Sequence, residues 1–183
     1  RRKSLPQEAA PWKKALPFFF LFVCFGAIHL IIQPTFGDDL FFPAALEGKA
    51  LAPWLKERYM TWSSRLLPEA VLALLFRLPV SVWKALDVAA VLLLFHGLQT
   101  LLNPGRDIRG GMVLALLVGC YPFFHMGSAG WMTTTVNYLW PLAVGVYAAS
   151  GIRRALAGER MLWYRRALWV LAAVYASGNE LSA

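Results

Sequence analysis

The amino-acid sequence predicts an all-α protein: a polytopic transmembrane helical bundle of about five spans, with interfacial helices in its first outer loop. Of its 183 residues, 58% are hydrophobic and only 15% are charged, and the mean hydropathy is +0.53. Soluble domains average about 45–50% apolar and about 25% charged residues. The composition therefore indicates an integral membrane protein whose length is better counted in spans than in soluble domains.

The basic residues are placed as membrane topology requires. The net charge is +8, and twelve of the eighteen basic residues fall in three short segments. These residues are Arg1, Arg2, Lys3, Lys13 and Lys14, then Arg106 and Arg109, then Arg153, Arg154, Arg160, Arg165 and Arg166. Segments rich in Lys and Arg stay on the cytoplasmic side. The pattern predicts a cytoplasmic N-terminus, and it argues against nucleic acid, which needs one contiguous basic surface.

Apolar runs of helical length define the expected spans. The first, 15–32, has eighteen residues without a formal charge and contains His29. The other spans are expected at about 82–102, 112–126, 136–151 and 161–177. Together they would form a single transmembrane domain over 1–183. Because the chain begins without Met and ends in mid-motif, we expect it to be the N-terminal part of a larger bundle.

The stretch 66–80 is apolar but interrupted. It contains Glu69 and Arg77, and a proline lies near each of its ends. Counting it as a span would reverse every later loop and place the arginines of 153–166 outside, against the charge rule. A helix in the outer interface, or a re-entrant helix, fits better. The first outer loop is therefore expected to cover 34–81.

Asp38 and Asp39 are adjacent carboxylates that follow the first span within seven residues, on a turn that contains Gly37. Such a pair can take a proton from a sugar hydroxyl, because an apolar wall and a like charge both raise a carboxyl pKa toward a useful value. It can also hold a divalent cation, or simply form a turn and cap a helix. The spacing leaves these three interpretations open.

Further along the same loop, Trp54, Arg58, Trp62 and Arg65 recur at spacings of four, four and three residues, which places them on one helical face. Arg offers a planar bidentate fork for a lipid-linked phosphate, and an indole can stack on a sugar ring. The alternative is an interfacial amphipathic helix with an aromatic belt.

Two later segments reach the same outer level. One contains Asn137, Tyr138 and Trp140 after a run of threonines, and the other ends in Glu180. Hydrogen-bonding groups beside flat rings suit carbohydrate, and they equally suit a helix cap and interface anchors. A carboxylate at that depth is costly unless it is paired or hydrated. The convergence of three outer segments is a stronger indication of a site than any one of them.

The sequence contains no recognisable motif for a metal site, a nucleotide site or a catalytic nucleophile. The three histidines lie in three different expected spans without ligand spacing, and the two cysteines lie in apolar runs. The chain has no phosphate-binding loop, dinucleotide fingerprint, nucleophile elbow or zinc spacing. ATP-driven transport is therefore not indicated.

Four motifs together carry a family resemblance. They are Asp38-Asp39, Tyr59-x-x-Trp62-x-x-Arg65, Asn137-Tyr138-Leu139-Trp140-Pro141 and Gly178-Asn179-Glu180. This pattern resembles bacterial multi-pass proteins related to the GT-C class of membrane glycosyltransferases, which includes O-antigen glucosyl transferases. The resemblance implies an all-helical bundle with interfacial helices over the active site, and a sugar donor carried on polyprenyl phosphate. It also implies a bacterial inner (cytoplasmic) membrane location. Members usually have more than five spans, and many carry a soluble C-terminal domain.

On this basis the sequence predicts an inverting glycosyltransferase acting on an extracytoplasmic acceptor. Asp39 would be the general base, with Asp38 orienting it or sharing a divalent cation such as Mg²⁺ or Mn²⁺. Arg58 and Arg65 would neutralise the phosphate leaving group. The sugar pocket would be lined by Trp62, Asn137, Tyr138, Trp140 and Glu180.

Two other functions stay open at this stage. A transporter or flippase for a lipid-linked or small polar substrate would need ionisable residues near mid-membrane. A non-catalytic membrane subunit would use the same loop motifs only for folding.

Overall fold

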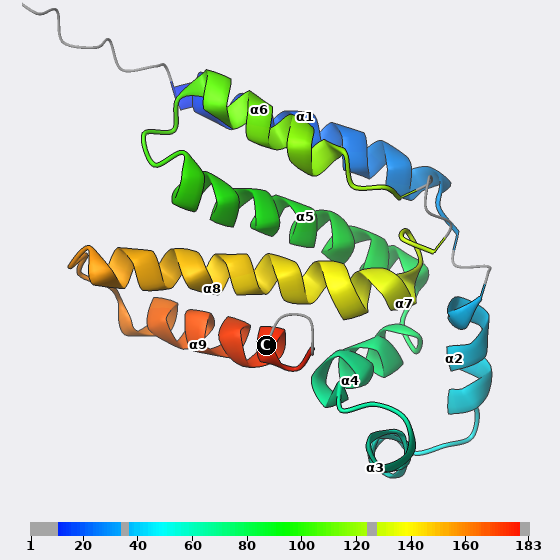
Figure 1. Cartoon of the computed structure of the whole chain (residues 1–183). Coiled ribbons are helices and arrows are strands. Elements are labelled where there is room, and N and C mark those ends of the chain that lie inside the picture. The colour runs from blue at the N-terminus through cyan, green and yellow to red at the C-terminus, as the bar shows by residue number, and fades with distance from the viewer. Residues whose placement is uncertain (1–10, 34–36, 124–127, 180–183) are drawn as a thin grey trace, which may run out of the picture.

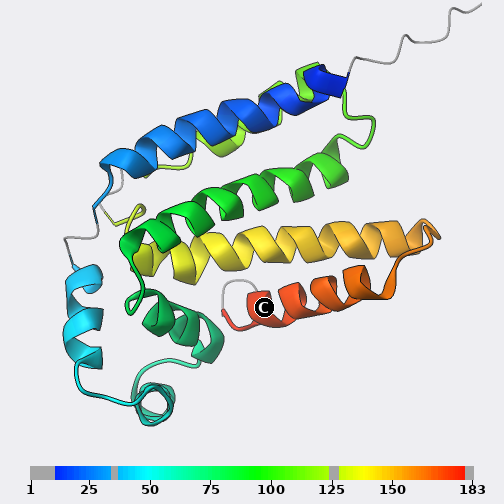
Figure 2. The same cartoon turned by 180° about the vertical axis from the view of Figure 1, so that it is seen from behind.

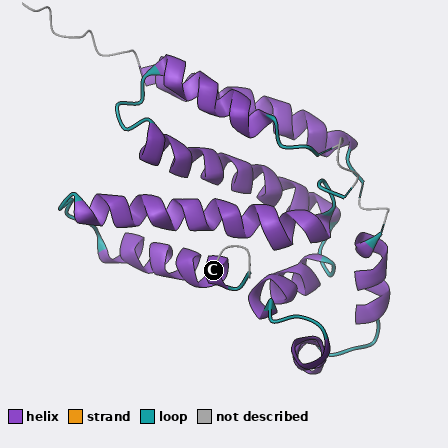
Figure 3. Ribbon diagram, viewed as in Figure 1, coloured by secondary structure: helices purple, strands orange, loops and turns teal. Residues whose placement is uncertain are grey.

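The computed structural model describes residues 11–33, 37–123 and 128–179. All of its regular structure is helical, and no strand occurs in these ranges (Figure 3). The all-α prediction is confirmed. The predicted site residue Glu180 lies outside the described residues.

Five helices pack together, and each runs in the opposite direction to the one before it in the chain (Figures 1 and 2). They are α1 (Pro11–Ile31), α5 (Val80–Leu102), α6 (Ile108–Gly119), α8 (Trp140–Leu156) and α9 (Trp163–Ser177). The neighbours α1 and α6 are therefore parallel. The start of α1 and the loops 103–107 and 157–162 share one end of this layer. All the described members of the basic segments therefore lie at or near one end, which we call the basic end.

Within the described residues, α1 and α5 are the two helices long and apolar enough to cross a membrane. Only 22% of the most apolar 18-residue stretch of α1 is buried, and Phe19 and Leu30 are 62% and 81% exposed. An apolar helix so exposed is unlike the core helix of a soluble domain. Helices α6, α8 and α9 have 12, 17 and 15 residues. Two of the five expected spans thus meet the length and composition criteria.

Helix α6 ends at Gly119, before the expected limit at residue 126. Cys120 closes it, and Pro122 follows two residues later. Proline has no amide N–H to continue the ladder, and its ring disfavours helical geometry in the residue before it.

Three short helices gather at the end of the layer opposite to the basic end (Figure 1). They are α2 (Asp38–Leu46), α3 (Leu51–Thr61) and α4 (Leu66–Leu75). The apolar stretch that begins at Leu66 forms the 10-residue α4 and does not run the length of the long helices. We call this the polar end, because the predicted site residues of the described chain cluster here.

The helix that contains α8 begins irregularly. Residues Met132–Thr134 form α7, and Thr135–Leu139 form a π-helical turn, η1, before α8 starts at Trp140. The π-turn inserts one extra residue per turn, and such turns are frequent at functional sites. Asn137 and Tyr138 of the predicted sugar site both lie in it.

Two glycines set how closely the long helices approach. A Cβ atom on Gly97 of α5 would lie 2.8 Å from the Val146 side chain of α8, and one on Gly151 of α8 would lie 2.1 Å from the Trp169 ring of α9. Small residues let helix backbones come into direct contact. The buried core between the helices includes Leu21, Phe25, Trp83, Val91, Phe95, Val136, Leu139 and Ala143.

Candidate functional site at the polar end

Asp39 ties α2 to the start of the α7–α8 helix. Its Oδ2 accepts a hydrogen bond from the backbone N–H of Met132 and its Oδ1 accepts one from that of Thr133, each at 2.8 Å. Asp39 is 2% exposed. Met132 and Thr133 are the first residues of α7, whose N–H groups have no partner inside the helix. Asp39 is therefore an N-terminal cap supplied by a distant segment of the chain.

Gly37 positions this cap. Its φ of 57° lies in the left-handed region, which glycine adopts at little cost. A Cβ atom there would lie 2.1 Å from the Trp131 ring. Only glycine lets the turn pack against Trp131 and bring Asp39 to the helix end.

Opposing effects act on the Asp39 carboxyl, and burial is the largest of them. Burial raises the pKa of Asp39 above its ordinary value of 3.8, while the hydrogen bonds from the backbone N–H groups of Met132 and Thr133 oppose the shift. The partial positive charge of a helix N-terminus also favours the ionised form. Asp38, the preceding residue, is exposed. The two carboxylates predicted as one unit thus have different surroundings.

A cation site on the two carboxylates stays a prediction, and the surroundings of the two groups differ. Both oxygens of Asp39 face N–H donors, which leaves Asp38 as the open carboxylate. A divalent cation bound by protein needs several convergent oxygen ligands. In the described ranges no group of three or more His, Cys, Asp and Glu residues could hold a metal ion.

Arg58 forms a forked ion pair with Glu69. Its Nε lies 3.0 Å from Oε2 and its Nη2 lies 3.0 Å from Oε1. Glu69 is 3% exposed, and the guanidinium packs over the rings of Phe42, Trp54 and Trp62 at 5.4–5.6 Å. This arrangement joins α3 to α4 and uses the bidentate face of Arg58 within the protein. Trp62 remains 72% exposed.

Arg65 reaches the π-turn. Its Nη1 donates to the Tyr138 hydroxyl at 3.1 Å, and its guanidinium carbon lies 5.7 Å from the centre of the Tyr138 ring. The Ser63 hydroxyl accepts from both the Nε and the backbone N–H of Arg65 at 3.1 Å. Arg65 is half-buried and Tyr138 is 42% exposed, so this contact faces the outside.

Asn137 is buried beside the cap and keeps one polar atom unused. Its Nδ2 donates to the Thr133 carbonyl at 2.8 Å, and Asn179 donates to the Asn137 carbonyl. Its Oδ1 has no hydrogen-bond partner among the described residues. Thr133 thus links the two predicted motifs, because its N–H bonds Asp39 and its C=O bonds Asn137. Buried polar atoms are nearly always paired, so the free Oδ1 indicates a place for a ligand group or water.

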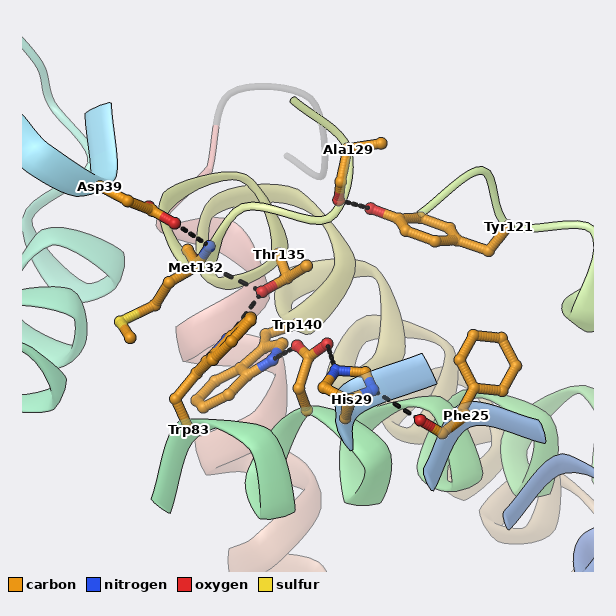
Figure 4. A network of polar contacts seen from close by, with 10 residues as sticks. Phe25, His29, Asp39, Trp83, Tyr121, Ala129, Met132, Thr135 and Trp140 are labelled. Atoms are coloured by element: carbon orange, nitrogen blue, oxygen red, sulfur yellow. Dashed lines mark hydrogen bonds and ion pairs between the residues drawn. The ribbon is translucent and has the colours of Figure 1, made fainter. Parts of the chain in front are cut away.

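A second polar cluster, not foreseen from the sequence, lies in the long helices beneath the polar end (Figure 4). The Asp87 carboxylate in α5 is fully buried, lies 2.9 Å from His29 Nε2 of α1, and accepts the Trp140 indole N–H at 2.6 Å. His29 Nδ1 lies 2.7 Å from the Phe25 carbonyl. Because a carbonyl only accepts, the contact with Phe25 is a hydrogen bond in the tautomer that carries its proton on Nδ1.

The sequence held a weak signal for this cluster. His29 is the one ionisable group of the apolar run 15–32, and Asp87 lies in the apolar run 82–102; ionisable residues in such runs tend to pair. Trp140, predicted to line a sugar pocket, directs its indole N–H into the bundle toward Asp87.

Comparison with protein-family models, with curated proteins and with solved structures finds no match. The family resemblance of the motifs therefore stays a prediction.

Proposed function

We propose that this protein is a membrane-embedded glycosyltransferase that moves a sugar from a polyprenyl-phosphate donor to an extracytoplasmic acceptor at the polar end. The observation that carries the proposal is the unpartnered Asn137 Oδ1, buried in a π-turn and joined through Thr133 to the Asp39 cap. A sugar hydroxyl is the type of donor that this acceptor lacks.

The proposed topology uses all five long helices as spans. The 21 residues of α1 cover about 31 Å, which matches the hydrocarbon thickness. The shorter α6 and α9 would span with the help of their flanking segments or by local thinning of the bilayer. The basic end would face the cytoplasm and the polar end the outside, in keeping with the charge rule.

In this proposal the two aspartates have different roles, one catalytic and one structural. Asp38 is exposed and is the accessible carboxylate that can accept the acceptor's proton. Asp39 would hold α2, and so Asp38, against the start of α7. The earlier assignment of Asp39 as the base stays a prediction that the variants below can separate from this one.

The two arginines also take different roles. Arg65 and Tyr138 present a guanidinium and a hydroxyl at the half-exposed surface, where they would bind the donor phosphate. Arg58 would act as a positioning residue, because its fork is occupied by Glu69. By fixing α3 it would present the exposed Trp62 indole to a sugar ring.

The test uses the full-length protein in nanodiscs with a labelled polyprenyl-phosphate sugar. Asp38→Asn is expected to keep donor binding and the unfolding temperature and to lose transfer by at least a hundredfold, the range for a general base. Glu47→Gln is the matched control, since Glu47 is an exposed carboxylate in the same outer region. Absence of donor binding by the wild type would refute the proposal. Unchanged transfer by Asp38→Asn would refute only the base assignment.

One observation favours the alternative of a transporter or flippase. The His29–Asp87 pair places two ionisable groups 2.9 Å apart between two apolar helices, and ionisable groups at such positions often mark proton or substrate pathways. Asp87 lies seven residues from the outer end of α5, about 10 Å along its axis. Proton-driven uptake in proteoliposomes that is abolished by Asp87→Asn, together with absence of sugar transfer, would establish this alternative.

A further inference from the structure

A basic cavity lies at the opposite end of the molecule from the proposed sugar site. It has a volume of about 310 Å³ and is lined by Thr100, Pro104, Arg106, Arg153, Arg154, Ala157 and Glu159. The lining comes from the C-terminal turn of α5, the loop after it, and the end of α8 with its following turn. Three guanidinium groups face one carboxylate there, so the cavity carries an excess of positive charge.

The loop that carries Arg106 is rigidly built. The Asn103 side chain donates to the Asp107 carbonyl at 2.9 Å and accepts from the Asp107 N–H at 3.3 Å, which closes the loop on itself. Asn103 is 7% exposed and also donates to Gln99 at 3.0 Å. The backbone of the loop on both sides of Arg106 is therefore held by a buried amide.

Arg106 itself has a strained backbone. Its φ of 50° makes it the one non-glycine residue with positive φ in the described part of the chain. The neighbouring Gly105 could take such a conformation at little cost but has a negative φ. Strained backbone of this kind clusters at functional sites, because the surrounding structure must hold it in place. Here the strained residue is one of the arginines that line the cavity.

The other two arginines have fixed geometry with unused donors. Arg153 donates through Nη1 to the carbonyls of Thr100 and Leu101 at the end of α5. Arg154 donates through Nε to Glu159 at 2.7 Å. Each guanidinium has five N–H donors, so both retain donors for another acceptor. No hydrogen bond or ion pair of the Arg106 guanidinium occurs with the described residues.

From this geometry we infer that the cavity binds the phosphate of an anionic phospholipid in the leaflet at the basic end. Arginine forks match phosphate oxygens, and basic pockets between helices on the cytoplasmic side bind lipid head groups. Exposed apolar residues adjoin the lining segments in the chain and favour a lipid over free phosphate: Leu102 and Leu156 are 65% and 85% exposed. Acyl chains would cover these side chains, whereas a soluble anion would leave them in water. The inference goes beyond sugar transfer and depends only on the proposed topology.

The experiment measures lipid retention by the full chain in detergent, using native mass spectrometry with added phosphatidylglycerol or phosphatidylcholine. The wild type is expected to retain one phosphatidylglycerol and to bind it about tenfold more tightly than Arg106→Gln does, the ratio that one lost charge-assisted hydrogen bond supports. Phosphatidylcholine is expected to bind weakly, because its ammonium would meet the arginines. Arg109→Gln is the matched control: it makes the same charge change on an exposed residue of α6 outside the cavity.

A second variant separates binding from folding. Arg106→Gly removes the guanidinium and relieves the positive φ, so it is expected to raise the unfolding temperature without lipid while losing the phosphatidylglycerol. Equal lipid retention by Arg106→Gln, Arg109→Gln and the wild type would overturn the site. Stabilisation by millimolar inorganic phosphate that equals the effect of the lipid would overturn the lipid assignment.

Discussion

The Asp39 cap yields the sharpest test of how the polar end is built. Two buried N–H groups, those of Met132 and Thr133, depend on one carboxylate. A buried donor left without a partner costs about 1–3 kcal/mol, and loss of an ordinary helix cap costs about 0.5–2 kcal/mol. Asp39→Ala removes both acceptors but also removes the cost of burying a charge. We therefore expect it to destabilise the fold by about 3 kcal/mol.

The conservative variant should have a smaller effect. An asparagine at position 39 can accept one of the two hydrogen bonds, while its NH₂ group faces the other donor. We expect Asp39→Asn to cost about 1–2 kcal/mol, which corresponds to a fall in unfolding temperature of roughly 2–8 °C for a chain of this size. Asp38→Asn should stay within about 0.5 kcal/mol, because Asp38 is exposed and surface changes are usually small.

The assay is thermal unfolding of the three variants in detergent, followed by circular dichroism, beside sugar transfer by each at a temperature where all are folded. The expected order of stability is wild type equal to Asp38→Asn, then Asp39→Asn, then Asp39→Ala. If Asp39→Asn kept the wild-type unfolding temperature and lost transfer, the capping role would be refuted and Asp39 would be restored as the base.

Three further predictions concern single interactions. Arg58→Ala should lower the free energy of unfolding by about 3 kcal/mol, because it leaves Glu69 buried and unpaired. The double change Arg58→Met with Glu69→Leu should recover most of that loss in a denaturation series. Equal losses in the two proteins would contradict this prediction. Gly151→Ala should lower the unfolding temperature, since its Cβ would lie 2.1 Å from a ring atom, whereas Gly26→Ala, with no atom within 4 Å, should not. Burial raises the pKa of Asp39 above 3.8, so the folded protein binds that proton at higher pH than the unfolded chain does. The stability contribution of this group should therefore be largest at acid pH and decline as the pH rises above 3.8, and a wild-type profile parallel to that of Asp39→Asn would disprove it.

The proposed phosphate site and the proposed sugar site can fail independently. The first lies at the basic end, between the ends of α5 and α8, and the second lies at the polar end, around α2–α4 and the π-turn. A variant such as Arg106→Gln should therefore leave sugar transfer unchanged at saturating donor, while Asp38→Asn should leave lipid retention unchanged.

Local sequence determined the helices and where several of them end. Apolar runs predicted α1 and α5, and the Asn103-Pro104-Gly105 break closes α5 where expected. Periodicity predicted that Trp54, Arg58, Trp62 and Arg65 share one helix face, which is correct only for the first two. Helix α3 ends at Thr61, so Trp62 lies just past its end and Arg65 immediately precedes α4. The Arg58 guanidinium still lies 5.5 Å from the centre of the Trp62 ring. These features depend on backbone geometry and on transfer of apolar side chains, which residues near in sequence decide.

The tertiary structure decided which polar side chains have a partner within the protein and which remain exposed. Asp39 caps a helix 93 residues away, Arg58 is neutralised by Glu69, and His29 meets Asp87 across 58 residues. No local pattern specifies such partners, because a buried polar group is satisfied by whatever packing brings within about 3 Å. The sequence by itself thus identified Asp38, Asp39, Arg65 and Asn137 as candidates. Only the fold separated the carboxylate that holds the structure, Asp39, from the carboxylate that stays exposed, Asp38.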